Sequence, residues 1–343
     1  MKKFKVLVVD DSALIRRILK DIINSDEDFE VVAEASDGLE AIDKIREVDP
    51  DIVTLDIEMP KVNGLIALQH ILRIKSLPVL IVSSYTKTGS KIALKALELG
   101  AIDVVEKPSS LDYKEKKNEI IVKLKTGVKA NLMNLNQSVL EIEKNEKIFN
   151  KKRVEATKLV AIASSTGGPK SLMDIIPNIK NDIDGAIAIV QHMPAGFTKS
   201  FAERLDSISN LNVFESYDNY KLLNGDCVIA QGGKHMVFDE NGYIIHTDDP
   251  PYHSVRPSAD IMMISAVKYF KNRIIGVVLT GMGKDGSEGV KIIKKMNGKN
   301  IVESKESALI YGMPKSAEET GAVDFVLDRK YIAKKIEELL NEI

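Results

Sequence analysis

The sequence has one cysteine, Cys227, and no tryptophan. A single cysteine excludes an internal disulfide framework and fits a reducing compartment, so we expect Cys227 to be a small buried side chain. No apolar run approaches the roughly 18 residues of a membrane helix. The basic start Met1–Lys5 leads into an apolar run that stops at Asp10, which is too short for a signal peptide core. These absences predict a cytoplasmic protein without direct membrane insertion.

The sequence also lacks an excess of either charge. It has 48 basic and 50 acidic residues, which gives a net charge of -2. Such a balance offers no general attraction to nucleic acid or to an acidic membrane surface, and we expect no nucleic acid partner. What the sequence does contain is a hydrophobic fraction of 44%, typical of a globular protein, and its 343 residues suggest two domains.

The first 110 residues alternate short apolar segments with segments of helical periodicity. Such alternation predicts a parallel sheet covered by helices on both faces. The predicted strands are Phe4–Val9, Val31–Ala33, Ile52–Leu55, Val79–Val82 and Asp103–Val105. The predicted helices lie at 14–23, 41–48, 65–72, 92–99 and 114–125.

The alternation resumes after a stretch rich in Asn, Glu and Lys, which we interpret as a partly helical linker. Strands are predicted at 159–163, 186–190 and 274–279, and the segments Cys227–Ala230, His235–Asp239 and Tyr243–His246 indicate antiparallel pairing. Asp239–Gly242 is a turn signal between the last two. Helices are predicted at 169–176, 196–205, 258–269, 287–296, 315–319 and 329–341.

Acidic residues follow the first and third predicted strands. Asp10 and Asp11 end the first and Asp56 ends the third, so three carboxylates should crowd one pocket and favour a hard cation such as magnesium. Ser83 ends the fourth strand and Lys107 follows the fifth. This set suits phosphoryl transfer to Asp56, with the metal on Asp11 and Asp56, and with Lys107 and Ser83 holding phosphoryl oxygens.

Four segments in this half resemble a response-regulator receiver domain over roughly residues 1–125. The resemblance implies a flavodoxin-like (βα)5 fold and phosphorylation of Asp56 by a chemotaxis histidine kinase, with Mg²⁺. A receiver that is never phosphorylated is the alternative. Val104 stands where many receivers have an aromatic residue. The segments are Val8-Val9-Asp10-Asp11-Ser12, Leu55-Asp56-Ile57-Glu58-Met59-Pro60, Val82-Ser83-Ser84 and Glu106-Lys107-Pro108.

In the second half, three predicted strands run into a serine, a histidine and an aspartate. Open α/β sheets bind ligands at the carboxyl ends of their strands. Ser165, His192 and Asp285 therefore suit the roles of nucleophile, base and orienting acid. Gly167-Gly168 and the following helix start offer N–H groups and a positive dipole to developing negative charge. The chain order Ser, His, Asp and the missing Gly-x-Ser-x-Gly elbow disfavour an α/β-hydrolase.

This half resembles the catalytic domain of chemotaxis protein-glutamate methylesterases (CheB), and with the receiver in front the resemblance covers almost the whole chain. One departure is Ala163, where the family usually has glycine. Ser164 adjoins Ser165, but the spacing to Thr166-Gly167-Gly168 favours Ser165. The matching segments are Ala161–Pro169, Gln191–Thr198, Arg256–Asp260, Leu279–Gly286 and Tyr311–Pro314.

The resemblance implies a phosphorylation-regulated hydrolase that acts in chemotactic adaptation. Ser165 would attack methyl esters of glutamate on methyl-accepting chemotaxis receptors, with backbone N–H groups of Thr166 and Met282 holding the oxyanion and no cofactor in this domain. Deamidation of receptor glutamines is implied too. The receiver would block the active-site mouth until Asp56 is phosphorylated.

Together the two halves predict an α/β protein in three parts. A (βα)5 flavodoxin-like receiver spans residues 1–125, a linker 126–157, and a doubly wound, mainly parallel catalytic domain with a small antiparallel hairpin 158–343. The alternative function is a receiver-controlled protein that docks on receptors without turnover. A DNA-binding regulator lacks support, because the second half has no basic recognition-helix pattern.

Other polar residues have weaker functional interpretations. The spacing of His235, His246 and His253, with nearby Asp248 and Asp249, matches no usual zinc pattern, so hairpin or loop positions are favoured over a metal site. Arg256 is equally compatible with binding a substrate carboxylate and with a structural ion pair. Met193 and Met282 are compatible with pocket lining, but core positions are favoured.

Overall fold

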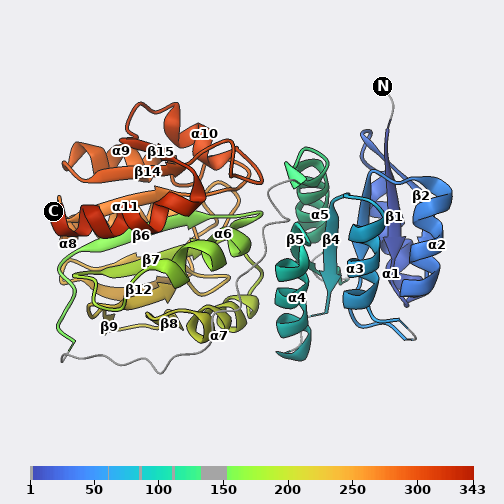
Figure 1. Cartoon of the computed structure of the whole chain (residues 1–343), viewed down its shortest axis with the longest axis horizontal. Coiled ribbons are helices and arrows are strands. Elements are labelled where there is room, and N and C mark those ends of the chain that lie inside the picture. The colour runs from blue at the N-terminus through green and yellow to red at the C-terminus, as the bar shows by residue number, and fades with distance from the viewer. Residues whose placement is uncertain (1–2, 61, 85–86, 110–112, 133–152) are drawn as a thin grey trace. The chain divides into compact units, whose positions relative to one another are not determined.

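The computed structural model describes residues 3–60, 62–84, 87–109, 113–132 and 153–343 (Figure 1). The chain divides into two compact units, Met1–Gln137 and Ser138–Ile343. This division falls within the predicted linker 126–157, of which residues 133–152 lie outside the described residues. The exact domain boundaries stay a prediction.

The first unit is a five-stranded parallel sheet with the order β2-β1-β3-β4-β5. All five predicted strands are present, and β2 is longer than predicted at both ends. Val6 to Val9 are buried because helices cover both faces of the sheet. The strands are β1 Phe4–Val9, β2 Phe29–Ala35, β3 Ile52–Leu55, β4 Val79–Ser83 and β5 Asp103–Glu106. The helices are α1 Ala13–Asn24, α2 Gly38–Val48, α3 Gly64–Ile74, α4 Lys87–Leu99 and α5 Tyr113–Gly127.

The second unit has a seven-stranded parallel sheet with the order β15-β14-β13-β6-β7-β10-β8 and a separate three-stranded antiparallel sheet, β11-β12-β9. The strands are β6 Leu159–Ser164, β7 Ala186–Gln191, β8 Asn212–Glu215, β9 Tyr220–Lys221, β10 Asp226–Ile229, β11 His235–Phe238, β12 Tyr243–Thr247, β13 Ile274–Val278, β14 Lys299–Glu303 and β15 Phe325–Leu327. The helices are α6 Gly168–Ile175, the short 3-10 helix η2 Ile176–Asn178, α7 Phe197–Ile208, α8 Ala259–Phe270, α9 Ser287–Lys295, α10 Met313–Glu318 and α11 Arg329–Glu342.

One strand-pairing prediction for this unit is wrong. The segment 227–230 was expected to pair antiparallel, but β10 runs parallel to β7 and β8 inside the large sheet. All four residues of β10 are buried, as is typical of a parallel strand covered on both faces. The β11–β12 hairpin is confirmed, and the N–H of Gly242 donates to Asp239 O at 3.1 Å in its turn.

The position of β6 explains where the site forms. From β6 the chain moves to β7 on one side of the sheet, and it later returns to place β13 on the other side of β6. Right-handed crossovers in opposite directions put α6 and α9 on opposite faces (Figure 1). The carboxyl ends of β6, β7 and β13 thus meet at a topological switch point, where open α/β sheets bind ligands.

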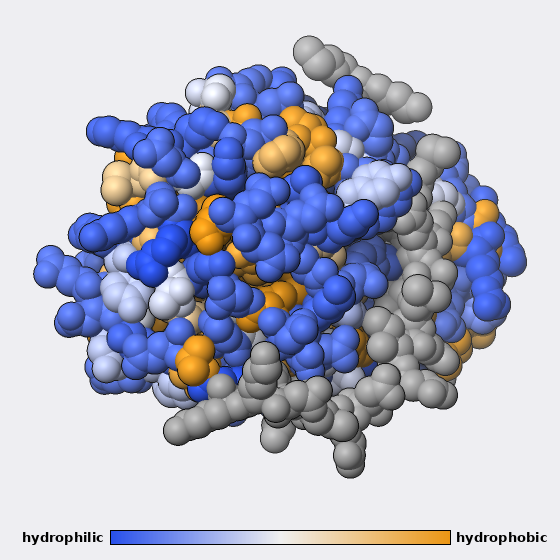
Figure 2. Space-filling model, turned by 60° about the vertical axis from the view of Figure 1, so that its left-hand side comes forward, coloured by the Kyte–Doolittle hydropathy of each residue, from blue (hydrophilic) through white to orange (hydrophobic). Residues whose placement is uncertain are grey.

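The surface carries no extended apolar belt on the face drawn in Figure 2, where hydrophobic residues form small patches among hydrophilic ones. Within the described residues, no helix combines the length and the apolar character needed to cross a lipid bilayer.

Candidate active site and acidic pocket

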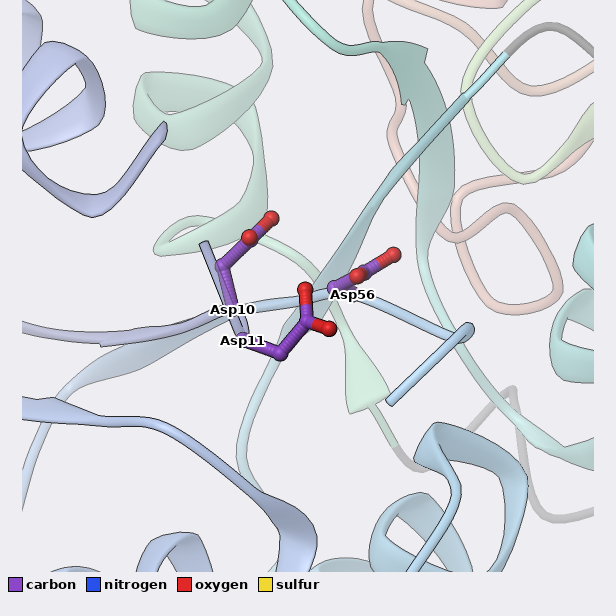
Figure 3. Close-up of side chains that lie close together, drawn as sticks. All are labelled: Asp10, Asp11 and Asp56. Atoms are coloured by element: carbon purple, nitrogen blue, oxygen red, sulfur yellow. The ribbon is translucent and has the colours of Figure 1, made fainter. Parts of the chain in front are cut away.

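The acidic pocket of the first unit forms as predicted at the ends of β1 and β3. Carboxylate oxygens of Asp10, Asp11 and Asp56 lie within 4.8 Å of one another (Figure 3). Asp10 and Asp56 are buried, whereas Asp11 is exposed. Among the described residues, this is the one group of three acidic, histidine or cysteine side chains with metal-ligand spacing.

Lys107 binds two of these carboxylates. Its Nζ lies 2.8 Å from Asp10 Oδ2 and 2.8 Å from Asp56 Oδ2. Burial raises the pKa of Asp56 to about 6, with the charge of Asp10 adding to the rise and Lys107 opposing it. Burial lowers the pKa of Lys107, but its hydrogen bonds to the two carboxylates raise it by more, so the ammonium stays charged.

The residues of this pocket fit a magnesium ion. A hard cation prefers oxygen ligands, and three crowded carboxylates with one lysine leave net negative charge for it to offset. Ser83 Oγ at the end of β4 is buried without a hydrogen-bond partner among the described residues. Because the N–H of Lys107 donates to Ser83 O, this hydroxyl and the ammonium come from adjacent strand ends. An unsatisfied hydroxyl at this edge suits an oxygen-rich ligand.

In the second unit, the structure brings the predicted base and acid together. His192 Nε2 lies 2.8 Å from Asp285 Oδ2. Asp285 also accepts from Ser258 Oγ at 2.7 Å and from the N–H groups of Ala259 at 2.7 Å and Asp260 at 3.0 Å. The aspartate therefore sits at the N-terminus of α8, where the helix dipole favours negative charge.

These donors decide the charge of Asp285. Burial alone raises the pKa of this carboxyl, but the hydrogen bond and charge of His192, with the donors at the start of α8, lower it by more. Asp285 is therefore a permanent anion near neutral pH. It can orient the imidazole and stabilise the imidazolium.

Ser165 lies at the end of β6, next to His192 at the end of β7. Its N–H donates to Thr280 O at 3.1 Å, and the N–H of His192 donates to Ser164 O at 3.0 Å. Within the described residues, the Ser165 hydroxyl makes no hydrogen bond to the imidazole. Because Nε2 faces Asp285, Nδ1 is the nitrogen that remains to receive a proton. Hydrogen bonds between nucleophile and base are often long before substrate binds.

The hydroxyl of Ser164 is already engaged in a buried hydrogen bond. Ser164 is fully buried, and its hydroxyl donates to Gln191 Oε1 at 2.7 Å. Gln191 Nε2 in turn donates to the backbone oxygens of Ser165 and His192, each at 3.0 Å. Sequence reasoning did not single out Gln191, although a polar residue at the end of a buried strand next to His192 was a usable signal. This pairing favours Ser165 over Ser164 as the nucleophile.

The predicted oxyanion donors come from two loops. Thr166 is buried just before Gly167, which has a φ of +79° and caps α6, while Met282 follows β13 and is 44% exposed. The N-terminus of α6, with Pro169 in its first turn, points positive backbone groups at this region. The use of these two N–H groups stays a prediction.

The other polar residues have structural partners. His235 contacts Pro250 O at 3.2 Å and accepts from the N–H of Ser258 at 3.1 Å, and His246 pairs with Ser216 at 2.7 Å. His253 lies 3.7 Å from Asp260. The three histidines thus have separate partners, and the metal-spaced group among the described residues contains none of them.

Arg256 donates to the backbone oxygens of Asp248 and Asp249, each at 3.0 Å. These are structural hydrogen bonds to carbonyl groups and not the ion pair considered from the sequence. The prediction of a core position is confirmed for Met193 and wrong for Met282, which is exposed. Cys227 is buried in β10 as expected.

Ala163 occupies a regular position in β6. It pairs with Val278 of β13 and Val190 of β7 in uninterrupted parallel register and belongs to a buried hydrophobic cluster of this unit. A Cβ atom on Gly286 would lie 3.0 Å from Ala163 Cβ, so the methyl group already fills the space beside that glycine. The added methyl is accommodated without a break in the sheet.

The first unit is a (βα)5 fold with an acidic pocket, and the second is a doubly wound fold with serine, histidine and aspartate at a switch point. This combination defines the class of receiver-linked hydrolases. Comparison with known families agrees. The CheB methylesterase family model matches residues 160–336, and the response regulator receiver domain model matches residues 6–116. The chain belongs to the CheB methylesterase family.

Individual relatives match nearly the whole chain. A protein-glutamate methylesterase/protein-glutamine glutaminase of Pyrococcus horikoshii is 45% identical, and the alignment covers 98% of this chain and 93% of the relative. A protein-glutamate methylesterase/protein-glutamine glutaminase 1 of Syntrophomonas wolfei is 44% identical over 99% of this chain and 100% of the relative. The crystal structure of the Thermotoga maritima CheB methylesterase catalytic domain is 41% identical with a TM-score of 0.52, and covers 55% of this chain and 100% of that chain.

Proposed function

We propose that this chain is a phosphorylation-regulated, cytoplasmic hydrolase that removes methyl esters from glutamates of methyl-accepting chemotaxis receptors and deamidates specific receptor glutamines. The observation that carries the proposal is the His192–Asp285 pair, held by the start of α8, at the strand end next to Ser165. Names of relatives that match nearly the whole chain support the same substrate chemistry.

In this mechanism the Ser165 hydroxyl attacks the ester carbonyl carbon while His192 Nδ1 takes its proton. The tetrahedral intermediate collapses as the C–O bond to the methoxy group breaks, and the imidazolium gives its proton to the departing methanol. Water then attacks the acyl-enzyme with His192 again as the base, which releases the glutamate and restores Ser165. Asp285 keeps the ring oriented and stabilises its positive form throughout.

The backbone N–H groups of Thr166 and Met282 hold the oxyanion of both tetrahedral intermediates. The same steps act on a glutamine side chain, where the C–N bond breaks and ammonia leaves with the proton from His192. The catalytic unit uses no cofactor in this scheme.

The receiver controls this site through Asp56. A chemotaxis histidine kinase is the phosphodonor, and Asp11 and Asp56, with Asp10 beside them, hold Mg²⁺. The ion supplies positive charge that offsets the carboxylates and the incoming phosphoryl group. Lys107 and Ser83 bind the phosphoryl oxygens. The unphosphorylated receiver restrains the catalytic unit.

Methanol release from methylated receptor, measured with and without a small-molecule phosphodonor and Mg²⁺, tests turnover and regulation together. We expect Ser165→Ala to abolish release and Ser164→Ala, its matched neighbour, to keep most of it. Unchanged release by Ser165→Ala would refute the site assignment. A protein that docks on receptors without turnover, the alternative function, would bind methylated receptor and release no methanol.

A truncated chain that begins at Arg153 tests the restraint by the receiver. It should be more active than the unphosphorylated full-length chain. Equal or lower activity of a folded truncated chain contradicts the restraint while leaving the catalytic assignment intact.

A further inference from the structure

We propose that Glu303 is a positioning residue for the oxyanion site, a role that rests on the proposed function. Its carboxylate fixes the backbone of Thr280, and Thr280 joins the loop that carries Thr166 to the loop that carries Met282. The pair Thr280–Glu303 thereby sets the distance between the two oxyanion donors.

Glu303 replaces a strand partner that Thr280 has lost. The paired positions of β13 and β14 end at Val278 and Val302, so Thr280 lies beyond the ladder. The N–H of Leu279 still donates to Ala163 O on the β6 side, so by strand alternation the N–H of Thr280 faces β14. There Glu303 Oε2 accepts it at 2.9 Å.

Thr280 connects the two loops with three further hydrogen bonds. Its carbonyl oxygen accepts the N–H of Ser165 at 3.1 Å, and its hydroxyl donates to Thr166 O at 3.0 Å. The same Oγ1 accepts the N–H of Ile310 at 2.9 Å. The next residue, Gly281, leads directly to Met282, and its N–H donates to Ile310 O at 3.1 Å. A shift of Thr280 would therefore move both loops relative to each other.

Glu303 is itself held firmly. It is fully buried, and Oε1 accepts from Ser307 Oγ at 3.2 Å and from Ser171 Oγ at 3.4 Å. Ser171 lies in α6, which begins just after the serine loop, and Arg329 donates to Ser171 Oγ at 3.2 Å. Burying a carboxylate costs free energy unless hydrogen bonds compensate. The hydrogen bonds that Glu303 accepts come from α6, from the end of β13 and from the 304–310 loop.

The geometry of the oxyanion site is sensitive to such an anchor. Its donors must lie within roughly 2.7–3.1 Å of the developing oxyanion. A misplacement of about 1 Å is enough to cost about 100-fold in rate. Since Glu303 touches neither the substrate nor the triad, its loss should lower kcat and leave KM nearly unchanged.

The test compares three variants of the full-length chain. Glu303→Leu removes the acceptor, whereas Glu303→Gln keeps a carbonyl oxygen for the N–H of Thr280. Asn300→Ala is the matched control, because Asn300 is a buried polar residue of the same strand whose amide bonds Val290 O and Ala322 O instead. The readouts are kcat and KM for methylated receptor, the melting temperature, and hydrogen–deuterium exchange of residues 280–283.

We expect Glu303→Leu to lower kcat by about 10- to 100-fold with little change in KM, and to speed exchange at 280–283. Glu303→Gln should restore both to near the parent values, and Asn300→Ala should lower the melting temperature without a comparable loss of kcat. If Glu303→Leu does not fold, Thr280→Val, which loses the hydroxyl bond to Thr166 O, should show the same kcat loss.

Parent-like kcat or parent-like exchange in folded Glu303→Leu overturns the inference, as does a Glu303→Gln variant as impaired as Glu303→Leu. Parent-like kcat in Thr280→Val overturns it if that variant has to be used. Failure of the proposed function looks different, because the parent chain would then release no methanol, or Ser165→Ala would release it at the parent rate. Hydrogen–deuterium exchange at residues 280–283 still tests the anchoring by Glu303 in either case.

Discussion

Asp56 and Asp285 are both buried aspartates at the carboxyl ends of parallel strands, yet their pKa values move in opposite directions. Asp56 accepts from the N–H groups of Ile57 and Glu58 and shares the Lys107 ammonium with Asp10. Burial and the charge of Asp10 nevertheless raise the pKa of Asp56 to about 6. Asp285 has four donors, including the start of α8 and His192, and its pKa is lowered despite its burial.

The difference teaches that neighbouring donors and charges, rather than burial alone, decide what a strand-end carboxylate can do. Asp285 is stabilised as an anion by fixed protein groups and needs no ion. Asp56 is crowded by like charge, so its anionic form, required of a nucleophile toward phosphorus, is favoured by a cation from solution. The Asp285 site therefore has all the charge partners it needs within the protein, whereas the Asp56 pocket favours a bound cation.

The largest expected effect on kcat comes from removing the charge of Asp285. Asp285→Asn places an amide among four donors and removes the charge that orients and stabilises the imidazolium. We expect kcat for methanol release to fall by about 1,000- to 10,000-fold, as in other serine triads that lose their acid. Asp248→Asn, at an exposed position of the same unit, is the control. A loss below 10-fold would show that the four donors do not make Asp285 essential.

The second test concerns the ligand-dependent pocket. Asp56→Asn should reduce incorporation of phosphate from a radiolabelled small-molecule phosphodonor to background and remove the stimulation of methanol release, while basal release stays. Chelation of Mg²⁺ should suppress incorporation in the parent chain as well. Asp43→Asn, on the exposed side of α2, should behave as the parent does. Phosphate that remains covalently bound in Asp56→Asn would place the modification elsewhere.

The pKa of a third buried aspartate, Asp260, is raised further than that of Asp56. Asp260 is fully buried beside Asp285, and Oδ1 accepts the N–H of Gly289 at 2.7 Å. Burial raises its pKa to about 7, and the charge of Asp285 adds to the rise. Between the unfolded pKa near 3.8 and the folded pKa near 7, the folded state binds a proton that the unfolded state lacks. Its contribution to stability is therefore lost as the pH rises through 7.

Asp260→Asn keeps the shape and cannot ionise. Relative to the parent, its free energy of unfolding should rise by about 3 kcal/mol between pH 5 and pH 8, as measured by urea denaturation of the catalytic unit. Asp182→Asn, an exposed change in the same unit, should show no such trend. A difference between Asp260→Asn and the parent that does not change with pH would contradict the assigned titration.

The comparison also shows what sequence could predict. The predicted site residues follow uninterrupted apolar strands, so the order of strand ends places Asp56, Ser165 and His192 from periodicity alone. The direction of β10 was missed because a buried four-residue run has no alternation to distinguish pairing types. The donors to Asp285 were missed because Ser258 and the start of α8 reach it across 25 to 27 residues of chain. Contacts of that range depend on packing, not on local pattern.

The smallest expected effect tests whether packing at the end of β6 influences kcat in addition to the donors and charges around Asp285. Ala163→Gly removes the methyl group next to Gly286, the residue after Asp285, without touching any donor to that carboxylate. Glycine in a strand interior should cost about 1 kcal/mol of stability. We expect kcat to change less than 3-fold, as measured by methanol release. Ala161→Gly, two residues earlier in β6, is the matched control for the loss of stability. A change in kcat above 10-fold for Ala163→Gly alone would mean that packing against Gly286 also controls how Asp285 holds His192.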